Sequence, residues 1–70
     1  MPLTLANNGI IYNIKKVSGS QQTRQFLENL GFLPETEIKI ISKLAGNLIV
    51  QVKESRVAIS KEMANNILVA

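Results

Sequence analysis

The stretch FLENLGFLP, residues 26–34, predicts where a short helix ends, and the remaining elements can be placed before and after it. Gly31 suits the left-handed position just beyond a helix, where other residues are strained. Phe32 can then fold back on Leu27, as a Schellman ending favours. Pro34 cannot continue the helix and favours a turn. This helix stop is the sharpest local signal in the chain.

The start of the same helix is predicted at Ser20, because a serine hydroxyl can accept a hydrogen bond from an unpaired amide of the first turn. The helix then covers residues 21–30. Its apolar residues form one narrow stripe, consisting of Phe26, Leu27 and Leu30.

Apolar and polar residues alternate on both sides of the helix, which predicts half-buried strands. Before the helix, Ile10, Tyr12 and Ile14 share one face, and a change of parity near Lys16 predicts a bulge or strand end. After it, three strands form a meander, and Ile41 breaks parity in the first. The expected inward residues of the meander are Ile38, Ile40, Leu48, Val50, Val52, Val57 and Ile59.

Ser60 can cap one helical turn, and residues 67–69 form a last short strand. The expected fold class is therefore mostly β: a small SH3-like β-barrel of about five strands. One short helix is inserted after the first strand, and a helical turn precedes the last. Short strands with bulges suggest a strongly bent, nearly closed sheet without free edges. Residues 1–70 are expected to form a single domain.

Composition excludes several classes of function. The chain has no cysteine and no histidine, so it lacks the commonest metal ligands and the commonest general base. No nucleophile elbow and no phosphate-binding glycine loop is present. We expect no enzyme, no bound metal and no cofactor. Without a signal peptide or a membrane-spanning apolar run, the expected location is the cytoplasm.

Protein docking is the remaining class of function. The strand pattern leaves Leu33, Ile41, Leu44 and Ile49 without inward positions, so a partner surface or a second copy of the chain can cover some of them. The candidate contacts are Leu33 and Pro34 beyond the helix, Leu44 and Ala45 at a hairpin, and the helix face around Arg24 and Glu28.

Two alternatives stay open on these residues alone. The net charge of +3 allows a small basic barrel that binds nucleic acid, although its three aromatic residues are not interleaved with basic ones. The unassigned apolar residues also allow a self-associating domain.

Residues 26–34 resemble the LxxLGF-P-G-T signature of the FeoA family of ferrous iron transport proteins. Residues 46–50 resemble the family's central hairpin, 56–60 its R-x-A-L stretch, and 64–69 its closing A-x-x-I-x-V. The resemblance covers residues 3–69. It implies an SH3-like barrel in the cytoplasm that modulates FeoB, a membrane ferrous iron transporter with a cytoplasmic G-protein domain. A related domain ends the iron-dependent repressors of the diphtheria toxin repressor family.

The chain departs from the family pattern at two turns. Glu35 stands where a glycine usually follows the proline, and this predicts a type I turn in place of type II. Ser55 stands where a glycine often precedes the arginine, so the turn before Arg56 is expected to differ in shape.

Overall fold

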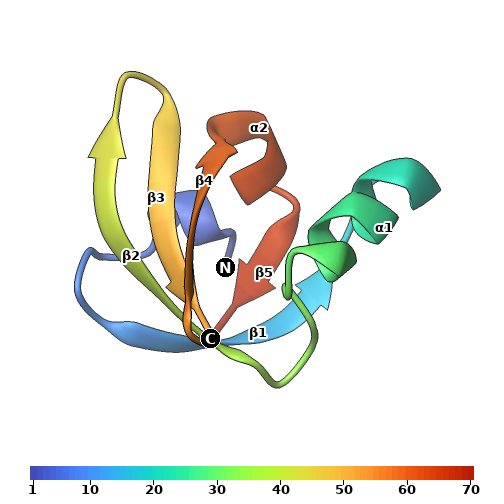
Figure 1. Ribbon diagram of the computed structural model, residues 1–70, viewed down its shortest axis with the longest axis horizontal. Coiled ribbons are helices and arrows are strands. Elements are labelled where there is room, and N and C mark those ends of the chain that lie inside the picture. The colour runs from blue at the N-terminus through green and yellow to red at the C-terminus, as the bar shows by residue number, and fades with distance from the viewer.

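Five antiparallel strands form one curled sheet, in the order β4-β3-β2-β1-β5. The computed structural model describes all residues, 1–70. Its elements are the 3-10 helix η1 (Leu3–Leu5), β1 (Ile11–Val17), α1 (Gln21–Asn29), β2 (Glu37–Leu44), β3 (Asn47–Val52), β4 (Ser55–Ser60), α2 (Lys61–Ala64) and β5 (Ile67–Val69). Figure 1 shows the strands curling around a common interior, with α1 projecting from one side.

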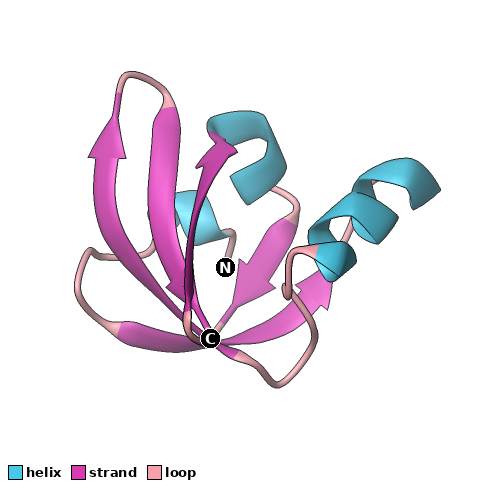
Figure 2. Ribbon diagram, in the orientation of Figure 1, coloured by secondary structure: helices cyan, strands magenta, loops and turns pink.

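This arrangement confirms the predicted SH3-like fold, with a helix after the first strand and a helical turn before the last (Figure 2). Both predicted bulges are present as shifts of register, one between Ile14 and Lys16 and one between Ile40 and Ser42. Such bulges increase local twist and let short strands wrap around a small core. Closure is incomplete, because β4 and β5 lie at the two ends of the strand order.

The core is entirely apolar, and it contains six of the seven residues predicted to point inward from the meander; Val57 is half-buried against it. The predicted inward position of Ile10 is wrong: its side chain is 49% exposed. The reason is that Ile10 precedes β1, beyond the part of the sheet that covers the core. The buried residues are Leu3, Ala6, Ile14, Leu27, Phe32, Ile38, Ile40, Leu48, Val50, Val52, Ile59, Ala64, Ile67 and Val69.

The N-terminal segment adds a feature that the sequence pattern did not predict. Leu3, the first residue of η1, and Ala6, directly after it, are buried in the core. The Met1 ammonium donates to the Val69 carbonyl at 2.9 Å, and the Val69 amide donates to the Met1 carbonyl at 2.7 Å. These two bonds hold the start of the chain along β5.

The predicted helix boundaries are confirmed at both ends of α1. The Ser20 hydroxyl accepts from the Thr23 amide at 3.1 Å. At the other end Gly31 has a φ of 104°. The Gly31 amide donates to the Glu28 carbonyl and the Phe32 amide to the Leu27 carbonyl, both at 3.0 Å, which is the Schellman pattern.

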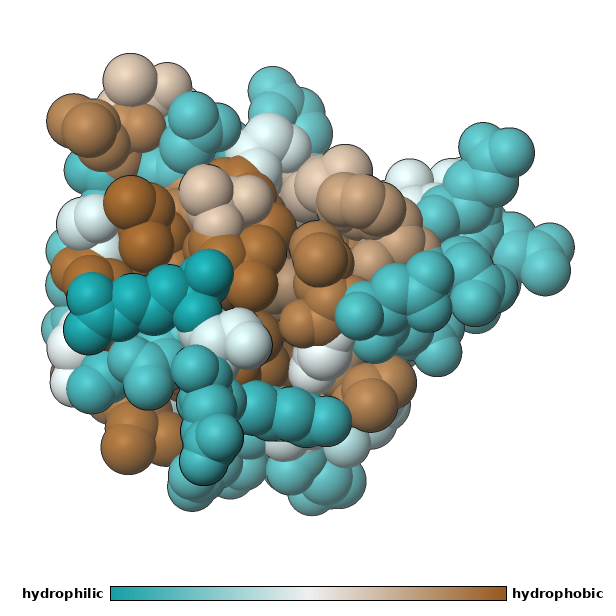
Figure 3. Space-filling model, in the orientation of Figure 1, coloured by the Kyte–Doolittle hydropathy of each residue, from teal (hydrophilic) through white to brown (hydrophobic).

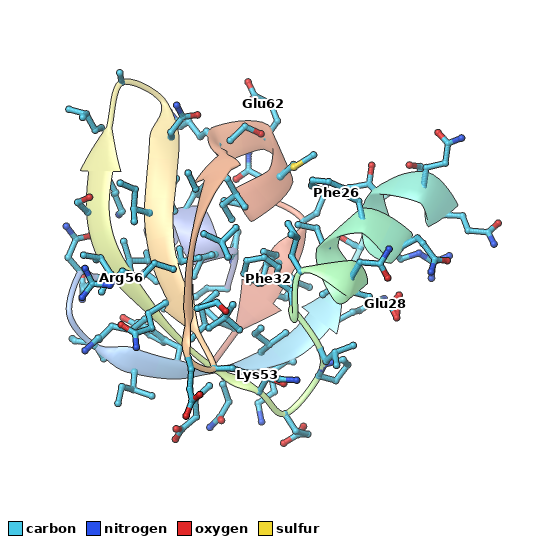
Figure 4. All side chains as sticks on the ribbon, in the orientation of Figure 1. Phe26, Glu28, Phe32, Lys53, Arg56 and Glu62 are labelled. Atoms are coloured by element: carbon cyan, nitrogen blue, oxygen red, sulfur yellow. The ribbon has the colours of Figure 1, made fainter.

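Phe32 and Phe26 have different environments although both belong to the stretch that ends the helix. Phe32 and Leu27 are fully buried, whereas Phe26 is 47% exposed. The buried apolar stripe of α1 is therefore narrower than the predicted one. The reason is that α1 projects from the barrel, so only one side of the helix reaches the core. Figure 4 shows Phe32 inside the barrel and Phe26 between α1 and α2.

The turn after α1 corrects the type I prediction at Glu35, which has a φ of 68°. With the Thr36 amide donating to the Leu33 carbonyl at 3.2 Å, this positive φ at the third position is typical of type II. A tertiary contact explains the difference: the Glu35 amide donates to the Ile14 carbonyl at 2.7 Å. Glu35 thus adopts a turn that normally favours glycine at this position, at a cost in backbone strain.

Candidate interaction surface

The β2–β3 hairpin carries the most exposed large apolar side chain of the protein, that of Leu44, at 71%. Leu44 pairs with Asn47, and only Ala45 and Gly46 connect the two strands. Their φ angles of 50° and 80° are those of a type I′ turn, whose twist matches the twist of the strands. The predicted hairpin is confirmed, and its tight turn holds Leu44 out from the barrel. Figure 3 shows apolar surface at this corner of the molecule.

The turn end of the hairpin is tied to the N-terminal segment through Lys43. Its ammonium donates to the Ala6 carbonyl at 2.9 Å and to the Thr4 carbonyl at 3.4 Å. A hollow of about 210 Å³ lies beside this contact, lined by Thr4, Lys43, Leu44, Ala45, Gly46, Asn47, Leu48 and Lys61. We call these eight residues the hairpin surface. It combines an exposed leucine with two ammonium groups. Such a surface is complementary to a partner surface that has an apolar patch surrounded by acidic side chains.

Leu33 and Pro34 lie in the turn between α1 and β2, away from the hairpin surface (Figure 1). Leu33 is half-buried and Pro34 is exposed. Leu33 is thus partly covered by the barrel itself.

Arg24 and Glu28 are exposed on α1 and lie four residues apart, on one helix face. They form no ion pair with each other, and the one ion pair of the structure joins Lys15 to Glu35 at 3.9 Å. The helix and the turn that follows it lie on one side of the molecule, and the hairpin lies at another corner (Figure 1). The structure therefore does not unite the six predicted contact residues into one site.

Two exposed apolar residues outside these three regions were not among the predicted contact residues. Leu5 is 69% exposed on η1, next to Thr4 of the hairpin surface. Ile11 is 60% exposed on β1 and borders a second hollow of about 350 Å³, otherwise lined by Thr36, Glu37, Ile38, Lys39, Gln51 and Lys53. The parity of Ile11, opposite to that of Ile14, signals its exposure, whereas no periodicity marks Leu5.

The acidic side chains are dispersed. No three of them lie close enough to form a candidate metal site.

Neither α1 nor α2 has the length and apolar content needed to cross a membrane.

Comparison with known proteins places the chain by sequence and by fold. The sequence model of the FeoA domain matches residues 1–70. No curated protein matches. A crystal structure of an iron uptake regulatory protein, FeoA, is 28% identical and has a TM-score of 0.89, with 99% of this chain and 93% of that chain covered.

Two further structures share the fold at lower identity. A zinc-complexed FeoA of Stenotrophomonas maltophilia, described as an SH3-domain protein, is 22% identical with a TM-score of 0.88, over 100% of this chain and 89% of that one. A manganese-dependent transcriptional repressor is 16% identical with a TM-score of 0.87, over 96% of this chain and 39% of that one. The match over every residue decides the assignment: the chain belongs to the FeoA family, and this membership implies a role in ferrous iron transport.

Proposed function

We propose that this protein is a cytoplasmic accessory protein of a ferrous iron uptake system and binds the cytoplasmic part of an FeoB-type transporter. It acts by docking and not by catalysis. Family membership supports the link to ferrous iron transport. The observation that supports a docking function is the exposure of Leu44. Its side chain is 71% exposed beside a tight turn, at the rim of a hollow.

The hairpin surface is the primary contact in this proposal, with Leu44 and Ala45 at its apolar centre. An exposed leucine contributes little to the stability of the free protein, so its value lies in burial against a partner. Leu33, Pro34, Arg24 and Glu28 remain proposed secondary contacts. Lys43 and Lys61 supply positive charge beside Leu44, which favours an acidic partner surface.

The test is a binding titration of the protein against the soluble G-protein domain of the transporter, together with ferrous iron uptake in cells. Leu44→Asp is expected to weaken binding by about tenfold or more, because it removes a buried apolar contact and places a carboxylate there. Leu33→Asp tests the turn region in the same assays. Ile11→Asp is the matched control, since Ile11 is similarly exposed but lies outside the hairpin surface. Equal binding and uptake by wild type and the folded Leu44→Asp variant would contradict the proposal.

A further inference from the structure

The hollow at the hairpin surface is lined by basic and neutral residues only. Lys43 and Lys61 are its two charged groups, and none of the five glutamates of the chain lines it. Neither lysine belongs to the one ion pair of the structure. The larger hollow beside Ile11 differs, because Glu37 lines it together with two lysines. The hairpin surface therefore carries positive charge with no carboxylate beside it in the hollow to balance that charge.

Backbone hydrogen-bonding groups hold both lysines at this hollow. The Lys43 ammonium donates to the Ala6 carbonyl at 2.9 Å and to the Thr4 carbonyl at 3.4 Å. The Lys61 amide donates to the Gly46 carbonyl at 3.0 Å, which fixes the first residue of α2 beside the hairpin turn. A surface that is ordered before binding loses less conformational entropy when a partner docks. The two positive groups are therefore preorganised for a ligand.

The side chains around the hollow keep hydrogen-bond donors that the protein itself does not use. An ammonium group has three N–H donors. Lys43 uses two of them on carbonyls, so one remains. The side chains of Lys61 and Asn47 form no hydrogen bond within the protein, so all their donors are free. A group of free donors with positive charge is complementary to a carboxylate, which only accepts hydrogen bonds.

We propose that this hollow receives the carboxylate of an aspartate or glutamate from the cytoplasmic part of the transporter. The inference rests on the proposed function and names the chemistry of the partner segment. The carboxylate accepts charge-assisted hydrogen bonds from Lys43 and Lys61. A neighbouring apolar side chain of the same segment covers Leu44, which is 71% exposed in the free protein. The partner segment is therefore acidic and apolar at adjacent positions.

The apolar part of the lining favours a protein segment over a nucleic acid. Leu44 and Leu48 line the hollow beside the two lysines, and none of the three aromatic residues of the chain does so. Proteins that bind single-stranded nucleic acid combine positive charge with aromatic side chains on which bases stack. A carboxylate flanked by an apolar side chain matches both the charge and the leucines of this surface.

The first test is a binding titration against the soluble G-protein domain of the transporter at low and at high ionic strength. Lys61→Met removes the charge, and the fold is expected to persist because the Lys61 side chain forms no hydrogen bond or ion pair. The dissociation constant is expected to rise about tenfold at low ionic strength and less at high, because salt screens exposed charges. Lys61→Arg is expected to restore most of the affinity. Lys53→Met is the matched control, since Lys53 is an exposed lysine that lines the other hollow.

The second test identifies the partner group by a charge swap. Lys61→Glu places a carboxylate at the hollow and is expected to weaken binding about a hundredfold or more, because like charges then face each other. Single aspartate-to-lysine and glutamate-to-lysine changes in the G-protein domain are then screened. A change at the contacting position is expected to restore binding to Lys61→Glu and to weaken binding to the wild type. If no such change restores binding, the hollow does not receive a carboxylate and the inference is overturned.

The outcomes separate this inference from the proposed function. If Leu44→Asp weakens binding and Lys61→Met does not, the carboxylate contact is overturned, whereas docking at the hairpin surface stands. If Lys53→Met weakens binding as much as Lys61→Met, the effect is one of overall charge, and the inference is again overturned. If the wild type does not bind the G-protein domain at all, the proposed function fails and the inference fails with it.

Discussion

Replacing Gly31 with alanine is expected to lower the free energy of unfolding by about 1 kcal/mol. At a φ of 104°, Gly31 lies in a backbone region that costs an L-residue about 1–2 kcal/mol. Against this cost, alanine raises the free energy of unfolding by about 0.4–1 kcal/mol, because it restricts the unfolded chain more than glycine does. Space is not the obstacle, because the nearest atom to an added Cβ is Val52 Cγ1 at 3.9 Å. The expected cost is therefore backbone strain at the helix stop.

Thermal and urea unfolding followed by far-ultraviolet circular dichroism measure this loss. For a domain of this size, about 1 kcal/mol corresponds to a fall of about 4–8 °C in Tm. Gly31→Asn is expected to lie between glycine and alanine, because asparagine tolerates the left-handed region. Gly19→Ala, at a similar φ of 102°, adds crowding against Asn66 Nδ2 at 3.1 Å and should cost more. A Gly31→Ala variant as stable as wild type would show that the positive φ at Gly31 carries no such cost.

Three further single substitutions are expected to change the stability of the protein. Phe32→Ala, at a fully buried core position, is expected to cost about 3–5 kcal/mol and to leave a chain this small largely unfolded by circular dichroism at 37 °C. Ala45→Asn is expected to raise Tm by a few degrees, because Ala45 has a φ of 50° and Asn-Gly suits a type I′ turn; an unchanged or lower Tm would count against that turn type. Ser20→Ala should cost about 1 kcal/mol by loss of the cap to Thr23, and a urea midpoint equal to that of wild type would show that the cap is not stabilising.

The elements that the sequence predicts well are those set by neighbouring residues. The end of α1 depends on Leu27, Gly31 and Phe32, which lie within six positions of one another, and the structure reproduces it bond for bond. The bulges near Lys16 and Ile41 are also local, since a change of parity is visible within a few residues. The hairpin at Ala45 and Gly46 follows from the same kind of signal.

What the sequence did not predict depends on distant parts of the chain. Glu35 adopts a positive φ because its amide bonds to Ile14, and no local rule for a glutamate anticipates that contact. Leu3 and Ala6 are buried by a segment whose Met1 pairs with Val69. The separation of the hairpin from α1 and its following turn is likewise a property of the folded barrel, so we take the hairpin surface as the primary candidate site.

Nuclear magnetic resonance reports, residue by residue, whether the hairpin surface receives the transporter. The isotope-labelled protein is titrated with the unlabelled G-protein domain of the transporter, and the amide shifts of all residues are followed together. We predict that the largest changes occur at Lys43, Leu44 and Ala45 and that Leu44→Asp abolishes them. Changes confined to the β4 edge or to the hollow beside Ile11, or no changes at saturating concentrations, would contradict docking at the hairpin surface.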